Sequence, residues 1–569
     1  MSAPALSAAA PRFGWRLPSL MTQQLVLGMV VLTGVAAVTL VPILFVVYGS
    51  LEPGAWTKGV LESDRTHQAL AYSLALALRA PFAALIGFLL AWLLIRFDIP
   101  GRSWLEFLLW VAFFVPILPT TLGWILLLDP SHGLLNALVH AIPPLRGLTF
   151  NIYSVWGILW VQVTASSVPV MVILLGPAIR QLGGSLEEAA RTCGASPWQI
   201  LRHVTVPILA PAILTGALAS FIRGLEAFEV EQLLGVPAGI YVFTTRVYDL
   251  INWEPPLFGQ AMAISTLMLA VLVTLAAAHQ YRTRHGAHDV VAGRAMSFEP
   301  LRIGRSGYVL SAALFALTVP IVLLPAGMLV LGSFMRVFGF FQLAQPFTTA
   351  NWQRVLADPV FLGALRNSVL LACGAALGGV TLYTGLAYLL VRSRMAGKPL
   401  IGLLTWLPWV VPGLLFSLAM LWLVLSNPLF ARFYGNALTL VLVVCVAQMP
   451  IGVNMMRVAV GHVSAELEHS ARVCGASVWH TLRDIVVPLI RPMLVSIGLL
   501  VFIAALRDIS TVIFLVTPAT QTLSTLMLQY STSGSLEGAT VLGVVTTGII
   551  LLAAGMVRAL GLNVVAARH

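Results

Sequence analysis

The sequence predicts an all-helical integral membrane protein with twelve spanning helices in two parallel homologous six-helix halves. Composition supports the membrane assignment, because 59% of the 569 residues are hydrophobic and 9% are charged. The mean hydropathy of +0.94 points the same way. These values lie well outside the range of soluble globular proteins. A polar segment that occurs twice between apolar stretches predicts the two halves.

Each spanning helix needs about 20 mostly apolar residues. Twelve stretches meet this requirement: 25–48, 69–95, 104–128, 155–179, 207–227, 257–281, 308–333, 361–391, 400–425, 438–456, 488–506 and 539–562. We expect the first to be a retained helix rather than a removed signal. Prolines at 116, 119, 408 and 412 predict kinks in the third and ninth, either as hinges beside a pathway or as rigidly packed bends.

The net charge of +11 follows membrane topology. Basic residues recur in alternate connections, whereas the intervening connections carry several acids. This pattern predicts that both termini and both copies of the repeated segment face the cytoplasm. No basic and aromatic module typical of nucleic-acid binding stands outside the spans. Cys193 and Cys474 occupy matching positions of the repeat and lack metal or redox spacing, so we expect small packing residues there and no metal site.

The repeated segment shows that the chain is duplicated. "SLEEAARTCGASPWQILRHVTVPILAP" begins at Ser185 and "ELEHSARVCGASVWHTLRDIVVPLIRP" at Glu466, and aligning Gly194 with Gly475 gives an offset of 281 residues. An earlier block repeats too, since "LLAWLLIRFDIPGR" matches "GLAYLLVRSRMAGK". Six spans separate the copies, so the repeat is parallel and predicts a pseudo-two-fold axis along the membrane normal.

These repeats predict the domain organisation. The expected units are an N-terminal cytoplasmic segment (1–24), a first half (25–281) with the repeated segment at 185–207, a linker (282–307), and a second half (308–569) with the segment at 466–488.

Each repeated segment is expected to fold as helix, glycine turn, helix. Ser185 can cap the first helix, Gly194 can end it in a left-handed turn, and Ser196 with Gln199 marks a second start. The result would be a small amphipathic projection into the cytoplasm. Alternatively, such a capped loop would only cover its own membrane domain.

The repeated segment resembles the EAA loop of ATP-binding-cassette (ABC) importer permeases. Glu188, Ala189, Ala190 and Gly194, followed by Val204, Val206 and Pro207, match its spacing. In the second copy His469 and Ser470 replace the Glu and the first Ala, whereas Ala471, Gly475 and Pro488 remain. "EAFEVEQLLGVPAGI" and "DISTVIFLVTPATQTLSTLM" further resemble fused permeases of the ferric-iron importer group. That resemblance implies the type I ABC importer permease fold.

In that family the loop is a coupling helix that docks on a nucleotide-binding subunit. The resemblance therefore assigns coupling to a set of residues in the two loops: Glu187, Glu188, Ala189, Ala190, Arg191, Gly194, Glu468, His469, Ala471, Arg472 and Gly475. No phosphate-binding loop surrounds either lysine, Lys58 or Lys398. ATP and Mg²⁺ are thus expected on two copies of a separate ATPase subunit, and a periplasmic binding protein is expected on the outer face.

Ionisable residues near the spans predict where a pathway would lie, because such groups usually face a cavity or a partner. The candidates for a gate or a weak substrate contact follow the fifth and eleventh spans: Arg223, Glu226, Glu229, Glu231, Arg507 and Asp508. Alternatively, they form an interfacial salt-bridge cluster. Arg79, by contrast, is expected to extend to the membrane interface.

The predicted function is the permease subunit of an ATP-driven importer in the bacterial inner membrane, with ferric iron as the expected substrate. Phosphonate, sugar phosphate, thiamine and polyamine remain alternatives. A stand-alone secondary transporter or channel is disfavoured because the repeated projection would lack a receptor. A membrane-embedded enzyme is disfavoured because no catalytic constellation appears inside a span.

Overall fold

The computed structural model describes residues 20–182, 184–285, 300–301, 303–393, 395, 397–426 and 428–559. Most of the expected N-terminal segment (1–24) and of the linker (282–307) lies outside these ranges, as do residues 560–569. The described part is built of helices, and its only β pairing consists of two isolated bridges. The all-helical fold class is confirmed.

The first half contains helices α1 to α13 with short 3-10 and π-helical segments (η). Their bounds are α1 (Leu20–Gly49), η1 (Thr57–Leu61), α2 (Asp64–Ala77), α3 (Arg79–Arg96), α4 (Arg102–Phe114), α5 (Ile117–Leu128), α6 (Leu134–Ala141), η2 (Pro143–Leu145), α7 (Val155–Gln162), η3 (Val163–Ser167), α8 (Val168–Gln181), α9 (Gly184–Thr192), α10 (Pro197–Ile200), η4 (Leu201–Thr205), α11 (Val206–Leu225), η5 (Glu231–Gly235), η6 (Val236–Ala238), α12 (Phe243–Ile251) and α13 (Phe258–His285).

The second half repeats this order with small differences. Its elements are α14 (Arg305–Ser333), α15 (Ala350–Ala357), α16 (Pro359–Arg392), α17 (Lys398–Val410), α18 (Gly413–Ser426), α19 (Pro428–Ala431), α20 (Ala437–His462), α21 (Ala465–Val473), α22 (Val478–Thr481), η7 (Leu482–Val486), α23 (Val487–Leu489), α24 (Arg491–Arg507), α25 (Leu523–Thr532) and α26 (Leu536–Ala559).

Within the described residues, nine helices are long and apolar enough to cross a membrane, and three bent pairs raise the number to twelve. The third and ninth expected spans are broken rather than merely kinked: α4 and α5 meet at 104°, and α17 and α18 at 108°. Each break falls at Pro116 or Pro412, because proline disfavours helical geometry in the residue before it. The segments before and after Ile490 meet at 78°, so the eleventh span begins after a bend that the sequence did not indicate.

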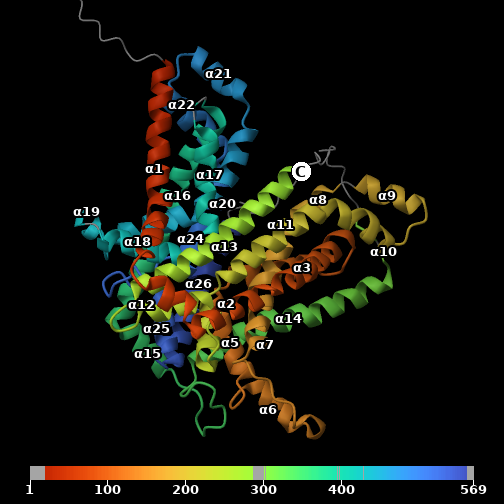
Figure 1. The fold of residues 1–569 in the computed structure, drawn as a ribbon. Coiled ribbons are helices and arrows are strands. Elements are labelled where there is room, and N and C mark those ends of the chain that lie inside the picture. Colours follow the sequence, from red (N-terminus) through yellow and green to blue (C-terminus); the bar gives the residue numbers. More distant parts are fainter. Residues whose placement is uncertain are drawn as a thin grey trace, which may run out of the picture.

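The helices form two arms that diverge from a common base (Figure 1). The first helix of each half packs against the other half. α1 of the first half packs against α17 and α18, whereas α14 of the second half packs against α4 and α5. The packing of α14 brings backbones very close, since a Cβ added at Gly123 on α5 would lie 2.0 Å from the carbonyl oxygen of Pro325 on α14. The halves are therefore interlocked rather than side by side.

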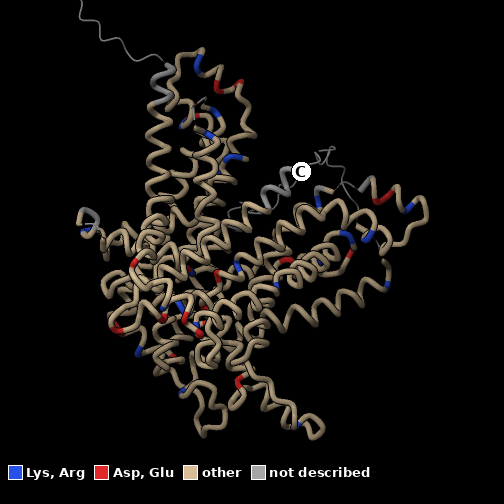
Figure 2. Tube along the Cα trace, in the orientation of Figure 1, with Lys and Arg blue, Asp and Glu red and all other residues tan. Residues whose placement is uncertain are grey.

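The duplication is visible in matching hydrogen bonds. Ser73 on α2 accepts from the backbone N–H of Phe243 at 2.7 Å, and Ser368 on α16 accepts from that of Leu523 at 2.7 Å. Most of the helix lengths carry no charge, whereas basic and acidic residues gather at the arm tips and around the common base (Figure 2). The repeated segments, α9–α10 and α21–α22, lie at the two tips (Figure 1).

Candidate functional site: an interface cavity and two repeated segments

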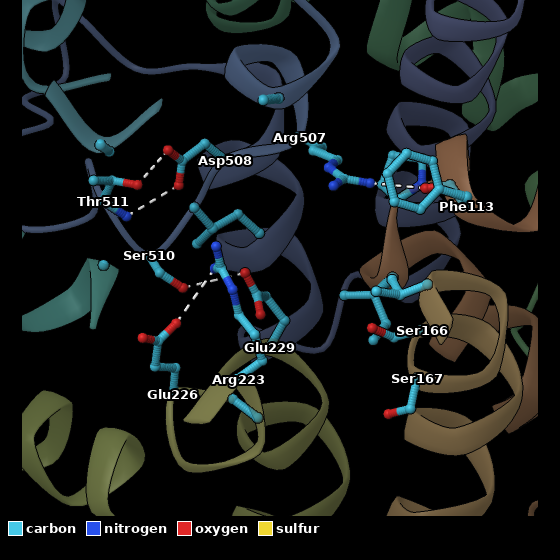
Figure 3. A pocket seen from close by; sticks show the side chains of 18 of the residues that line it. Phe113, Ser166, Ser167, Arg223, Glu226, Glu229, Arg507, Asp508, Ser510 and Thr511 are labelled. Carbon is cyan, nitrogen blue, oxygen red and sulfur yellow. Dashed lines mark hydrogen bonds and ion pairs between the residues drawn. The ribbon is translucent and has the colours of Figure 1, made fainter. Parts of the chain in front are cut away.

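A cavity of about 430 Å³ lies between the two halves where the arms meet. Its walls come from both halves: the α4–α5 bend, η3 and α11 on one side, and α17, α18, α20 and α24 on the other. Five of the six predicted pathway residues line it: Arg223, Glu226, Glu229, Arg507 and Asp508. Figure 3 shows these side chains gathered with Ser166, Ser167, Ser510 and Thr511. The structure thus brings together charges that the sequence places 281 residues apart.

Two arginines cross the interface in opposite directions. The Arg223 guanidinium of the first half lies 5.1 Å from the ring centroid of Trp409 in the second half. That of Arg507 in the second half lies 5.4 Å from the ring of Phe113 and donates to the Phe113 carbonyl at 2.8 Å. The spacing that aligns Pro116 with Pro412 also aligns Phe113 with Trp409. The two aromatic partners are therefore equivalent, whereas the arginines are not, since Arg507 aligns with Glu226 and Arg223 with Ala504. Each cation–π contact holds the halves together.

A hydrogen bond between two residues of the cavity lining also joins the halves. The hydroxyl of Ser510 donates to Glu229 at 3.2 Å, and these residues lie 281 positions apart. The same offset aligns Glu226 with Arg507. Glu226 forms an ion pair at 3.3 Å with Arg223 of its own half. Its second carboxylate oxygen is buried without a hydrogen-bond partner.

The remaining predicted residues are held locally. Asp508 caps the turn after α24, accepting from the Thr511 backbone N–H at 3.0 Å and from its hydroxyl. Glu231 does not line the cavity; it is 1% exposed and accepts from Gln162 at 3.1 and 3.2 Å. The expectation for Arg79 is wrong. Its side chain is 5% exposed, donates to the Leu76 carbonyl at 2.8 Å and lines the cavity, because the α2–α3 junction is covered by α11.

The charges around the cavity balance, with three arginines and three carboxylates in its lining. Among the described residues, no group of three or more His, Cys, Asp or Glu side chains is arranged to hold a metal ion. The lining can accordingly offer exchangeable ion pairs and hydrogen bonds to a passing charged solute.

Each repeated segment folds as two helices separated by a glycine turn, as predicted. Gly194 and Gly475 have φ of +84° and +85°, a conformation that other L-residues rarely adopt. Ser196 and Gln199 form a capping box at α10, with reciprocal bonds of 2.8 and 3.3 Å. Ser477 caps α22 through one of these two bonds, accepting from the His480 N–H at 3.3 Å.

The two glutamates at the start of these segments are buried. Glu187 is 1% exposed and pairs with Arg96, the last residue of α3, at 3.2 Å. Glu468 is 2% exposed and pairs with Arg392, the last residue of α16, at 2.7 Å. Both glutamates belong to the coupling set that the resemblance implies, but the two arginines do not, although the duplicated block that aligns Arg96 with Arg392 contained the signal.

The other predicted coupling residues lie at or near the surface. Exposed positions are Glu188, Ala189, Gly194, His469, Arg472 and Gly475, whereas Ala190, Arg191 and Ala471 are half-buried. Large apolar side chains stand out beside them, with Leu186 55% and Val473 88% exposed. The surface of each tip thus combines charged, small and large apolar side chains, and a buried ion pair lies beneath it.

The family described as "Binding-protein-dependent transport system inner membrane component" matches this chain twice, over residues 83–284 and 378–565. The chain belongs to this family. It is an integral inner-membrane protein with the permease role of an ABC importer, and the resemblance to fused permeases is confirmed. Membership in a binding-protein-dependent family implies, in general terms, an ATPase partner and a periplasmic binding protein.

Curated relatives agree on the permease role. A probable ABC transporter permease of Sinorhizobium fredii (y4fN) is 28% identical over 71% of this chain and 71% of that protein. A putative ferric transport system permease of Haemophilus influenzae (FbpB 1) is 24% identical over 65% of this chain and 58% of that protein, and so less than two thirds of it is covered. The molybdenum transport system permease ModB of Escherichia coli is 28% identical over 38% of this permease and 92% of its own length.

A solved bacterial ABC transporter involved in the import of the acidic polysaccharide alginate aligns with 44% of this permease and 95% of that chain, at 19% identity. The TM-score is 0.35, too low to add to the assignment.

Proposed function

We propose that this permease forms the translocation pathway of the importer between its two halves, and that the interface cavity is part of that pathway. The observation that carries the proposal is the cavity itself: it lies on the seam of the duplication and is lined by charged residues of both halves. Ionisable groups placed inside a membrane domain are costly and usually serve a pathway. In this proposal the Arg223–Trp409 and Arg507–Phe113 contacts close the interface between the halves on one side and act as a gate.

The exposed tips α9–α10 and α21–α22 are the proposed docking points for two copies of an ATPase subunit, one on each arm. Support comes from their duplicated sequence and their position at the ends of the arms. ATP-driven approach of the two subunits would bring the tips together and rock the halves about the base, which is alternating access driven by differential affinity. On this proposal the tips and both termini face the cytoplasm.

Native cysteines test that orientation. Cys193 and Cys474 are exposed on the two tips, and Cys445 is buried. A membrane-impermeant maleimide should label Cys193 and Cys474 in inside-out vesicles but not in intact cells whose outer membrane has been permeabilised. A Cys373→Ala background removes the exposed cysteine of α16, and labelling from outside would contradict the proposed topology.

The proposed substrate is ferric iron delivered by a periplasmic binding protein. The ferric transport permease among the relatives supports iron, whereas the molybdenum permease makes an oxyanion the main alternative. Phosphonate, sugar phosphate, thiamine and polyamine remain further candidates. Identifying the ligand that co-purifies with the binding protein decides among these substrates.

Reconstitution decides the mechanism. Proteoliposomes containing the permease, its ATPase subunit and the binding protein should take up radiolabelled ferric iron only when MgATP is present on the ATPase side. Uptake by the permease alone, without nucleotide, would instead establish a stand-alone transporter or channel.

A further inference from the structure

A buried arginine–glutamate ion pair occurs in both halves where each tip joins its arm, away from the interface cavity. The guanidinium of Arg96 pairs with Glu187 and also donates to the carbonyls of Ile179 and Leu182 at 3.1 and 2.9 Å. These carbonyls end α8, so one side chain joins the last turns of α3 and α8 to the start of α9. The hydroxyl of Thr205, just before α11, donates to the same Glu187 at 2.8 Å.

The second half repeats this arrangement contact for contact. Arg392 pairs with Glu468 and donates to the carbonyls of Val460 and Val463 at the end of α20. Val460 and Val463 are the counterparts, at the 281-residue offset, of Ile179 and Leu182. The second donor to the carboxylate comes from a different place, since the hydroxyl of Tyr388 on α16 donates to Glu468 at 2.9 Å in the role that Thr205 has for Glu187.

These ion pairs matter because the tip helices have few other attachments. α9 packs mainly on α10 and η4, and α21 mainly on α22, all within the repeated segments themselves. A force applied to α9 or α21 would therefore tilt that helix unless something fixed it to the long helices of its arm. The buried carboxylate does this in each half.

We propose that Arg96–Glu187 and Arg392–Glu468 are positioning pairs that make each tip move as one rigid piece with the arm that carries it. The inference rests on the proposed coupling function and adds residues that act behind the docking surface. Each pair would turn displacement of a tip by the ATPase into displacement of an arm, instead of a local tilt.

Burial explains why a charge pair suits this role. Removing one partner of a buried pair leaves the other charge uncompensated, so the pair resists opening. An exposed pair at the same end of the first half gives the contrast. Glu106, 30% exposed at the side chain, binds Arg102 at 3.0 Å and Arg180 at 3.1 Å, and such surface pairs contribute little. Glu106→Gln is therefore the matched control for Glu187→Gln.

Electron–electron distance measurements test the proposal without knowing the substrate. One pair of spin labels, on Cys193 and Cys474 in the Cys373→Ala background, reports the tips. A second pair, in a protein with the exposed native cysteines replaced by serine, reports the arms through Leu214→Cys on α11 and Leu377→Cys on α16, both exposed positions. Both distances are measured with the bound ATPase subunit, before and after MgATP.

In the unmodified permease, MgATP should shorten both distances. In Glu187→Gln with Glu468→Gln the tip distance should still shorten, while the change between the arms falls at least about threefold. Glu106→Gln should leave both changes intact. If the tip and arm distances of the double variant change as much as those of the unmodified permease, the positioning role is overturned.

A milder variant covers the case in which the double variant does not fold. Arg96→Lys with Arg392→Lys keeps the charges but cannot reach the carboxylate and both carbonyls at once, so the arm change should fall partway. An unchanged arm response there also contradicts the proposal. If the unmodified permease shows no nucleotide response in either pair of labels, the proposed coupling function fails instead.

Discussion

Glu229 and Ser510 occupy the same position in the two copies of the duplication, and they touch each other across the interface at 3.2 Å. Two equivalent positions can meet only where the pseudo-two-fold axis passes between them, so this hydrogen bond marks the axis inside the permease. In a dimer of identical halves the same point would bring two carboxylates or two hydroxyls together. Joining two diverged halves in one chain allows a donor to face an acceptor.

Restoring symmetry at that point should open the interface. Ser510→Glu would place two carboxylates at the axis, and like charges at this separation cannot both stay ionised without strong repulsion. We expect impaired ATP-dependent uptake near neutral pH, with recovery as the pH falls and one carboxylate takes a proton. Uptake in proteoliposomes over a pH series checks this. Ser510→Ala, which removes only the hydrogen bond, should show no such pH-dependent recovery.

The Arg223–Trp409 and Arg507–Phe113 contacts should limit access to the cavity from the outer side. Trp409→Ala or Phe113→Ala removes one cation–π contact, each contributing about 0.5–2 kcal/mol. We expect a cysteine introduced at Ser167 in the cavity lining to react several-fold faster with a small thiol reagent added from the outer side. Trp104→Ala, at an exposed tryptophan far from either arginine, is the control. Equal reaction rates in all four proteins would show that these contacts do not close the pathway.

Much of this architecture is readable from the sequence because apolar length and duplication are global signals. Apolar length located the spans, and the 281-residue offset located the repeat. The positions of glycines and charges located the turns at Gly194 and Gly475 and five residues of the cavity lining. Periodicity could not indicate that α4 and α5 part at 104°, because both remain apolar on either side of Pro116. It also could not show that α1 and α14 exchange arms, since helix packing depends on shape rather than on hydropathy.

Single charges were the hardest to place. Arg79 and Arg96 both sit near the ends of predicted spans, where arginines usually reach the interface. Each is instead buried: Arg79 donates to the nearby Leu76 carbonyl, and Arg96 lies among two carbonyls and a carboxylate supplied by residues distant in sequence. The match between Arg96 and Arg392 in the repeated block is the sequence signal that could have distinguished a buried structural arginine from one that only follows membrane topology.

The glycine turns of the tips should be sensitive to any side chain. A Cβ at Gly475 would meet no atom within 4 Å, so Gly475→Ala tests backbone conformation alone. At φ of +85° we expect a cost of roughly 1–2 kcal/mol and a displaced α22. Co-purification of the ATPase subunit should then decrease. Gly461→Ala, also without close neighbours but at the end of a right-handed helix, should not weaken it. Equal retention of the subunit by both variants would separate the turn from docking.

The close packing of α14 on α5 predicts a position at which an added methyl group destabilises the fold. A methyl group at Gly123 would fall 2.0 Å from the carbonyl oxygen of Pro325, and backbone cannot move aside as a side chain can. We therefore expect Gly123→Ala to lower the free energy of unfolding by about 1–3 kcal/mol, the usual range for an overpacked core. Thermal unfolding in detergent, followed by tryptophan fluorescence, measures the change. Gly327→Ala on α14 itself has no atom within 4 Å of the added group and should not be destabilised, because alanine favours the helix over glycine. If the two variants unfold at the same temperature, α14 does not pack on α5 as closely as the structure shows, and the interlocking of the halves would have to be revised.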